Sequence, residues 1–448
     1  MTKNNIKYAL QIIGFSLILS MLYIVNISKN IEGNITIFYI IALACILGIY
    51  YAKNSIFQIS NPSSFFIVAY IFFICLAPIV NINYFSKVIG TSKIIALIIL
   101  SLISYLIGDF FSDLIYKKNK NFKLKSLDNI LNNTKVDKII NYIYAFGILV
   151  MVAFYLGIGN IPIFMENAED MRAIVKQGKG SYIILSSVIF MMTTSYYIMQ
   201  VFRKQTNNKT NILIYIKIII PYMLLFGAGY RNPLAQLFLL NTITYYYIKY
   251  KKIKIKRLFI IITLLLFFLI GYSIFRYSGE VSISKLSTEM FTKILWMMFV
   301  NYSNVGMLVN LVDSHSLFYG RTYIKEFATL LPGQNENVGV MLKNMLGMNF
   351  SGEGVTLTIL GESYINFSYI GVIIIFFILG LVFKSLYYRF NLKDEVSELD
   401  ILFIIYMSIS SLKIITGGLA VYLLYYVLPF LVIYLFTKVV SKQIIFKL

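Results

Sequence analysis

Charged side chains are scarce in this chain. Only 13% of its 448 residues are Asp, Glu, Lys or Arg, whereas 59% are hydrophobic. A soluble protein of this length has a much more charged surface, so the composition argues against a soluble globular fold. Acids are the rarer sign, with 19 against 40 bases. The basic excess does not indicate nucleic-acid binding, because the lysines fall in short clusters between apolar runs, as orientation in a membrane requires.

Cysteine and histidine are also rare. Cys45 and Cys75, the two cysteines, lie inside apolar runs, which argues against a disulfide framework and a thiolate metal site. No cluster of metal-ligating residue types is visible, so neither a metal nor another cofactor is expected. His315 is the only histidine and lies in the polar stretch DSHSLFYGRTY. A lone histidine in a polar loop is more often incidental than catalytic, but nearby Arg321 makes it a candidate.

Long apolar runs fill most of the chain. Many approach or exceed the about 20 residues that cross a bilayer's hydrocarbon core, and they are continuous, which excludes an outer-membrane β-barrel. The first run has no small-residue cleavage site after it, so we expect a span there and not a signal peptide. The sequence predicts an all-α polytopic membrane protein with about twelve transmembrane helices. The predicted spans are 7–27, 35–52, 63–80, 93–116, 139–156, 182–202, 212–227, 232–248, 258–275, 368–387, 401–416 and 419–437.

Lysine clusters predict the orientation of these spans. The clusters are YKKNKNFKLKSLDN, FRKQTNNKTN, KYKKIKIKR and the tail TKVVSKQIIFKL. Because cytoplasmic loops are enriched in lysine and arginine, all four clusters should be cytoplasmic. An even number of spans places them, and both termini, on that side. No internal repeat is visible, so we expect one integral-membrane domain over 1–448.

One connection is much longer than the others. Segment 276–367, between the ninth and tenth predicted spans, should form a large outer loop that carries short helices. Within it, ILWMMFVNYSNVGMLVNLV is apolar but interrupted by Asn301, Ser303, Asn304 and Asn310. We expect an in-plane or re-entrant helix here, because a further span would invert every later segment and put the basic tail outside.

The arginines are distributed differently from the lysines. Four of the seven fall on the predicted outer side, against the usual bias: Arg172, Arg231, Arg276 and Arg321. Guanidinium is a planar fork that binds phosphate through two parallel hydrogen bonds, so several outer arginines indicate a pyrophosphate or another anion. The alternative is pairing with the outer acids Glu166, Glu169, Asp170 and Glu280.

Arg231 stands in the most confined position of the four. The stretch GAGYRNPL over 227–234 separates two strongly apolar runs and predicts a tight outer turn. Glycines allow close backbone approach in such a turn, and Pro233 can open the next helix without losing a hydrogen bond. A charge held there costs a few kcal/mol unless it is paired, which makes Arg231 a candidate functional residue.

A second stretch, GESYINFS over 361–368, leads into the tenth predicted span. Glu362 would lie at the outer membrane rim, followed by Tyr364 and Asn366. Low dielectric there disfavours the ionised carboxylate, so Glu362 could act as a base near neutral pH. The alternative is an acid that complements the dipole at a helix start.

At these stretches the chain resembles the bacterial oligosaccharide repeat-unit polymerases, the O-antigen and capsule polymerase (Wzy-like) family. That family typically has Gly-Ser-Arg-Gly in a short outer turn, where this chain has GYRN over 229–232. It also has Gly-Glu-x-Tyr-x-Asn-Phe-Gly before a late span, where this chain ends in Ser368. IGNIPIFMENAEDMRAIVKQGKG adds the isoleucine-proline and later arginine of a third element. Tyr230 and Asn232 replace small residues, but no charged group is lost.

The resemblance implies a fold like that of lipid-dependent, multi-span glycosyltransferases. It also implies an enzyme of the bacterial inner membrane that polymerises undecaprenyl-pyrophosphate-linked oligosaccharide repeat units at the outer leaflet. The product would be an O-antigen, a capsule or an exopolysaccharide. A chain-length-regulating membrane protein is a conceivable partner, and nucleic acid is not. The pyrophosphate leaving group needs cations, and the acceptor hydroxyl needs a base.

This chemistry assigns candidate roles to the residues above. The base is Glu362 or His315. The residues expected to bind pyrophosphate and glycan are Arg231, Arg172, Arg321, Arg276, Tyr230, Tyr364 and Asn366. Two other functions remain open. An O-antigen ligase uses the same donor and an outer loop with arginines and a histidine, although GESYINFS favours the polymerase. A lipid-linked oligosaccharide flippase predicts mid-span charges and an internal repeat, which is not visible here.

Overall fold

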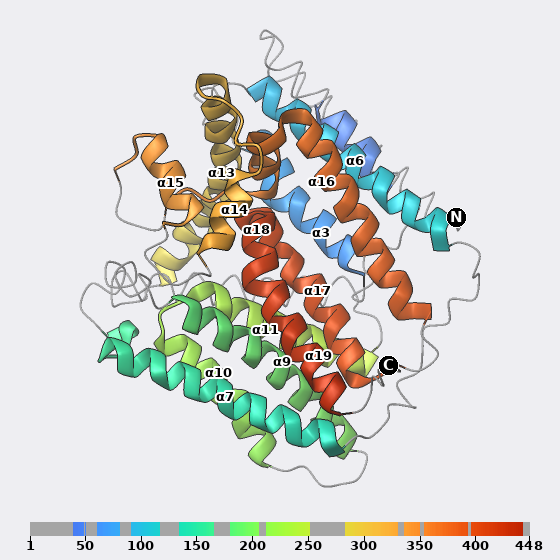
Figure 1. Ribbon diagram of the computed structural model, residues 1–448, viewed down its shortest axis with the longest axis vertical. Coiled ribbons are helices and arrows are strands. Elements are labelled where there is room, and N and C mark those ends of the chain that lie inside the picture. Colours follow the sequence, from blue (N-terminus) through green and yellow to red (C-terminus); the bar gives the residue numbers. More distant parts are fainter. Residues whose placement is uncertain are drawn as a thin grey trace.

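The computed structural model describes residues 39–48, 50, 61–80, 91–116, 134–164, 180–205, 212–250, 283–329, 336–349, 354–392 and 396–441. These residues form helices joined by turns, and no strand occurs among them (Figure 1). The all-α prediction is therefore confirmed for this part of the chain. The helices of the first half are α3 (Pro62–Tyr70), η1 (Ile71–Cys75), α4 (Ala77–Val80), α6 (Thr91–Tyr116), α7 (Thr134–Ile158), η3 (Pro162–Phe164), α9 (Gly180–Gln205), α10 (Ile212–Gly227) and α11 (Arg231–Tyr250), after a short helix at Tyr39–Gly48.

The second half adds the helices that surround the candidate site. They are α13 (Ile283–Ser314), α14 (Arg321–Ala328), α15 (Val338–Met345), α16 (Ile359–Leu392), α17 (Glu398–Gly417), α18 (Leu419–Tyr422), η4 (Leu423–Val427) and α19 (Leu428–Val440). Local sequence explains several boundaries. Ser397 and Asp400 form a reciprocal capping box that starts α17, and Gly418, with φ 86°, separates α17 from α18.

Six described helices are long and apolar enough to cross a membrane, and three shorter apolar helices accompany them. The six are Ser92–Tyr116, Lys135–Ile158, Gly180–Arg203, Ile359–Leu392, Glu398–Gly417 and Leu419–Val440. The chain is thus a multi-pass membrane protein. The number twelve stays a prediction, because the expected spans 7–27 and 258–275 lie outside the described residues.

Side-chain contacts give the directions of neighbouring helices. α7 and α9 are antiparallel, because Asp137 at the start of α7 bonds Arg203 at the end of α9. α9 and α11 are parallel, since Thr194 bonds Asn241 and, further along both helices, the Phe202 ring packs against the Tyr245 ring. These relative directions agree with the predicted order of the spans.

α6 and α16 form a close parallel pair (Figure 1). Glycines make this approach possible. A Cβ on Gly108 would lie 2.0 Å from the carbonyl oxygen of Phe377, and one on Gly380 would lie 2.1 Å from that of Tyr105. Backbone atoms cannot move aside as a flexible side chain can, so the crossing requires glycine at both positions. The pair holds the N-terminal part of α16 in place.

The helical bundle has two ends, which we define by the residues that lie there. The hairpin end contains the turns at Gly229 and Gly418, together with α14 and the start of α16. At the opposite end, Arg203 bonds Asp137 at 2.8 Å and lies 3.4 Å from Glu398. Asp400, next to Glu398 in α17, accepts bonds from Lys438 at 2.6 Å and Tyr434 at 2.8 Å. Buried charges at the opposite end are therefore paired, and these pairs tie α7, α9, α17 and α19 together.

The predicted loop 276–367 contains a longer helix than expected. α13 is continuous over 32 residues and includes all of ILWMMFVNYSNVGMLVNLV. It packs against α16, η1, α4 and α6, and Lys93 of α6 bonds Asp313 near its end at 2.7 Å. α13 is not one of the six helices with the length and hydropathy of a span. Whether it lies in the membrane plane stays a prediction.

The glycine crossing gives a stability prediction. We expect Gly380→Ala to destabilise the protein by at least about 1–3 kcal/mol, the usual penalty of overpacking, because its Cβ would meet backbone and not a side chain. The measurement is the thermal unfolding midpoint of the purified protein in detergent. Ile378→Ala, at a position 47% exposed on the same helix, is the control and should leave that midpoint nearly unchanged. An equal midpoint for both variants would contradict the predicted crossing.

Candidate active site

The candidate site is organised by a break inside α16. Phe367 (φ −139°, ψ 20°) and Ser368 (φ 56°, ψ −146°) are not helical and divide the helix into a short segment, 359–366, and a long one. The tenth span was predicted to begin at residue 368, and the long segment begins directly after it. The stretch expected at a membrane rim is instead a short helix whose residues 359–366 are buried.

The chain just before α14 fills the gap that this break leaves. A helix end leaves carbonyl groups without partners inside the helix. Here Phe318 N–H donates to the carbonyl of Ile365 at 2.9 Å, and Tyr319 N–H donates to that of Asn366 at 3.1 Å. The segment that leads to Arg321 is thereby fixed against the short helix that carries Glu362.

Asn366 completes this junction with its side chain. Its Oδ1 accepts from Gly320 N–H at 2.9 Å, while its Nδ2 donates to Thr322 Oγ1 at 2.6 Å and to the carbonyl of Glu362 at 2.8 Å. Asn366 is fully buried. In this structure it joins the start of α14 to the short helix and does not face open space, although the sequence suggested substrate contact.

Glu362 lies on the same face of the short helix, one turn before Asn366, and is also fully buried. Its Oε2 accepts a hydrogen bond from Leu419 N–H at the first turn of α18, and Ala420 N–H also bonds the carboxylate. The positive end of a helix dipole favours a negative charge at this point. Gly418 suits this approach, because its φ of 86° favours glycine and a Cβ there would lie 2.6 Å from Oε2. Oε1 is buried without a hydrogen-bond partner among the described residues.

A second carboxylate, which the sequence did not suggest, lies near Glu362. Glu326 of α14 is 4% exposed, its Oε2 accepts from Val338 N–H at 3.4 Å, and its charge acts on Glu362. Among the described residues, the charge that acts on Glu362 is this acid. Burial, and then the charge of Glu362, raise the pKa of the Tyr323 hydroxyl above its usual range, so this phenol stays neutral.

α14 also contacts the last helix directly. The Thr329 hydroxyl lies 2.5 Å from the Tyr425 hydroxyl of η4. η4 is a π-helical turn. Such turns are rare in proteins as a whole, and those that occur are often at functional sites. α14 carries Tyr323 and Glu326 and leads to the contact with Tyr425. Its residues show no motif in the sequence. Only their position shortly after Arg321 could have suggested Tyr323 and Glu326.

Tyr364 belongs to a different cluster from Glu362. It is 3% exposed, and Lys93 Nζ lies 5.3 Å from its ring centroid. The same Lys93 bonds both carboxylate oxygens of Asp313, at 2.7 and 2.9 Å. Residues two apart on a helix face nearly opposite sides, which separates Tyr364 from the Glu362–Asn366 face.

His315 and Arg321 are exposed at the hairpin end. His315 Nδ1 lies 2.9 Å from Ser314 Oγ in the turn that follows α13. Arg321 is the first residue of α14, two positions before Tyr323. Arg321 thus lies between Gly320 and Thr322, which both bond Asn366. His315 instead bonds Ser314 and the carbonyl of Leu311 beside it.

The glycine turn has the predicted shape. α10 ends at Gly227, α11 begins at Arg231, and Gly229 has φ 78°. The turn packs against the end of α7, where the Tyr155 hydroxyl donates to the carbonyl of Leu224. Tyr230 and Arg231 are half-buried. The other two predicted arginines, Arg172 and Arg276, lie outside the described residues.

No group of three metal-ligating side chains occurs in the described part of the chain. The candidate site is built from carboxylates, phenols and a helix N-terminus. It lies at one end of a helical membrane bundle, with basic residues at that end.

The described residues thus form a multi-pass helical membrane bundle with two buried carboxylates at one end. The family model for O-antigen polysaccharide polymerase Wzy matches residues 8–444, and the chain belongs to that family. Neither a search of curated proteins nor one of solved structures found a match. The family confirms the resemblance seen in the sequence and supports O-antigen repeat-unit polymerisation in general.

The break in α16 gives a prediction at Ser368. Its φ of 56° with ψ of −146° lies in a region that only glycine adopts without strain. We expect Ser368→Gly to stabilise the protein by up to about 1–3 kcal/mol, the usual size of such strain. Thermal unfolding in detergent measures the gain. Ser368→Ala keeps the strain and should give none; a gain in this control, or a loss with glycine, would contradict the assigned conformation.

Asn366 gives a second prediction, for a positioning role. Asn366→Ala removes the acceptor of Gly320 N–H and should release the start of α14. The expected result is faster amide hydrogen exchange at Gly320 and lower polymer yield, with normal membrane levels. Asn344→Ala is the control, because this α15 residue bonds exposed Glu336 at 2.7 Å. Unchanged exchange at Gly320 would show that Asn366 does not hold α14.

Proposed function

We propose that this protein joins undecaprenyl-pyrophosphate-linked oligosaccharide repeat units into a surface polysaccharide at the outer leaflet of the bacterial inner membrane. The terminal sugar hydroxyl of one lipid-linked unit attacks the anomeric carbon of the glycan on another. A glycosidic C–O bond forms, the bond from that carbon to pyrophosphate breaks, and undecaprenyl pyrophosphate leaves. The hydroxyl proton passes to a base on the protein.

The observation that carries this proposal is the state of Glu362. One carboxylate oxygen is held by the first turn of α18, which fixes the orientation of the group, while the other has no hydrogen-bond partner in the described structure. A base needs a fixed position and a free lone pair, so Oε1 is the atom to which we assign the proton. Because Glu362 is fully buried, the acceptor hydroxyl reaches it only when neighbouring side chains move.

The cations for the leaving group are proposed at the same end of the bundle. Arg321 begins α14, whose first residues bond Asn366, and Arg231 begins α11 after the glycine turn. Guanidinium suits a pyrophosphate because its parallel N–H groups match the phosphate oxygens. Arg172 and Arg276 remain further candidates from the sequence. His315 remains the alternative base.

The outer side of the membrane is assigned to the hairpin end. The basic clusters that should be cytoplasmic follow α6, α9, α11 and α19, and all four helices end away from that end. The candidate site therefore faces the leaflet where a lipid-linked glycan would be joined. The family match does not favour the ligase or flippase alternatives.

Glu362→Gln separates a catalytic role from a structural one. Glutamine keeps an oxygen that accepts from Leu419 N–H but removes basicity. We expect normal membrane levels and polymer reduced by about 10²–10⁴-fold, the range for loss of a general base, with single-repeat glycan on a gel. The control is Glu336→Gln, an exposed acid paired with Lys325 at 3.2 Å, which should make normal polymer. Long chains from Glu362→Gln, with their loss in His315→Ala, would transfer the role to the histidine.

Deletion of the gene tests the function as a whole. Glycan extracted from the deletion strain should carry one repeat unit. Transport of the lipid-linked unit precedes polymerisation and attachment follows it, and neither step requires polymerisation. Unlinked polymer would instead indicate a ligase. Complete loss of surface glycan would indicate an earlier step and contradict the proposal.

A further inference from the structure

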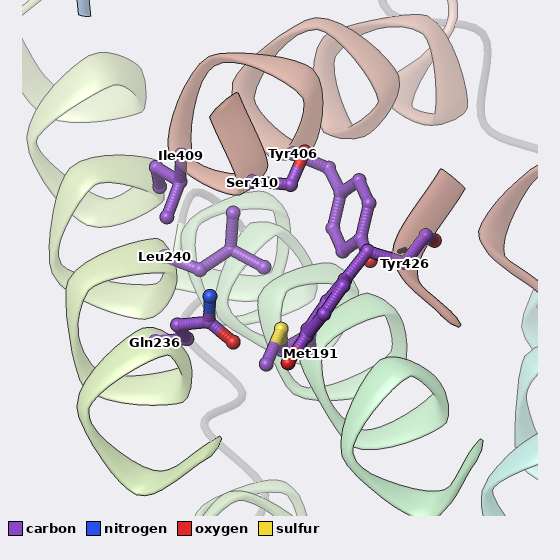
Figure 2. Close-up of a pocket in the computed structure, with 7 residues that line it drawn as sticks. All are labelled: Met191, Gln236, Leu240, Tyr406, Ile409, Ser410 and Tyr426. Carbon is purple, nitrogen blue, oxygen red and sulfur yellow. Dashed lines mark hydrogen bonds between the residues drawn. The ribbon is translucent and has the colours of Figure 1, made fainter. Parts of the chain in front are cut away.

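A crevice inside the bundle lies between α9, α11, α17 and η4. It is lined by Met191, Gln236, Leu240, Tyr406, Ile409, Ser410 and Tyr426 (Figure 2). Tyr426 lies seven residues after Leu419, which contacts Glu362, so the crevice is about two helical turns from the candidate base. None of its residues has a part in the chemistry assigned above.

Gln236 is the unexplained polar group of the crevice. Its side chain points into the space between the helices in Figure 2, and the residue is 6% exposed. Its Oε1 has no hydrogen-bond partner among the described residues. The space is too narrow to hold a water molecule as it stands, so water does not satisfy this oxygen. A buried acceptor without a partner destabilises the fold, which indicates a partner in another state of the protein.

Lys413 supplies a cation at the edge of the same crevice. It follows Ile409 and Ser410 by four and three residues, which places it on their face of α17. Its Nζ lies 5.5 Å from the ring centroid of Tyr426. Lys413 is one turn from the end of α17 at Gly417, and thus near the junction with Glu362.

Several lysines of the described helices pair with acids, and Lys413 does not. Four described lysines form ion pairs: Lys93 with Asp313, Lys325 with Glu336, Lys384 with Asp113, and Lys438 with Asp400. No acid in the described ranges lies within ion-pair distance of Lys413, which contacts the Tyr426 ring. A cation inside a membrane bundle without an acid partner indicates a functional site, here for an anion.

We propose that Lys413, Tyr426 and Gln236 bind the phosphate-linked sugar of the lipid-linked donor. Lys413 contacts the phosphate, and Gln236 Oε1 accepts a hydrogen bond from a hydroxyl of the adjoining sugar. The site rests on the proposed function and adds to it a lysine for the leaving group. Binding requires the side chains of the crevice to separate. The π-helical turn of η4, which carries Tyr426, is the place where the last helix departs from α-helical geometry.

The test measures binding without turnover. Full-length protein in phosphatidylcholine nanodiscs is titrated with undecaprenyl pyrophosphate, undecaprenol and inorganic pyrophosphate. Lys413→Met keeps an apolar chain over Tyr426 and removes the charge, so it should bind undecaprenyl pyrophosphate at least about tenfold more weakly, as expected for a lost charged hydrogen bond. Lys413→Arg should bind nearly as the wild type does. The matched control is Lys249→Met, since Lys249 Nζ also lies 5.5 Å from a tyrosine ring, that of Tyr245.

Gln236→Met tests the sugar contact separately. This variant keeps the volume and removes the acceptor. It should weaken binding of the lipid-linked repeat unit by several-fold and leave undecaprenyl pyrophosphate binding unchanged. Equal weakening of both ligands would contradict the sugar contact.

Several outcomes would overturn the lysine site. They are wild-type affinity of Lys413→Met for undecaprenyl pyrophosphate, an equal loss with undecaprenol, and a loss confined to inorganic pyrophosphate. The last result would assign the site to free pyrophosphate and not to the lipid. If the wild type itself does not bind undecaprenyl pyrophosphate, the proposed function is wrong. If the wild type binds it and Lys413→Met binds it equally well, only the lysine site is wrong.

Discussion

The contact between the Glu362 carboxylate and the first turn of α18 determines how the hairpin end is built. It joins a buried acid on α16 to the N-terminus of the last membrane helix, where the helix dipole stabilises negative charge. The contact is made beside glycine at position 418, whose φ of 86° other residues rarely adopt and where a Cβ would meet the carboxylate. It also needs the break at Phe367–Ser368, which separates the short helix with Glu362 from the long span.

The surrounding contacts follow from that break. The carbonyls of Ile365 and Asn366 have no hydrogen-bond partner within the helix. Backbone N–H groups of the segment before α14 donate to them instead. α14 is thereby held where Glu326 lies near Glu362 and where Thr329 reaches Tyr425. The hairpin end is thus held by polar contacts between segments far apart in the sequence. The opposite end is held differently, by ion pairs such as Arg203–Asp137 and Lys438–Asp400.

The sequence predicted the elements but not these long-range contacts. Apolar runs identified the membrane helices, and GAGYRNPL identified the tight turn, because glycine and proline have direct conformational meaning. GESYINFS identified Glu362 as a candidate, yet the carboxylate was expected at a rim and is fully buried. Serine at position 368 gives no sign of a positive φ, so the break could not be inferred from that residue. Glu326 and Tyr425 were missed because only the folded chain brings α14 to η4.

The central claim is that sugar transfer takes place where Glu362 meets the last helix. An electron cryo-microscopy structure of the protein with a bound, non-hydrolysable analogue of the lipid-linked donor tests it most directly. The account predicts the analogue's phosphates at the hairpin end and its anomeric carbon on the side of Glu362 that carries Oε1. An analogue bound at the opposite end, near Arg203, or one whose anomeric carbon lies away from Glu362, would contradict it.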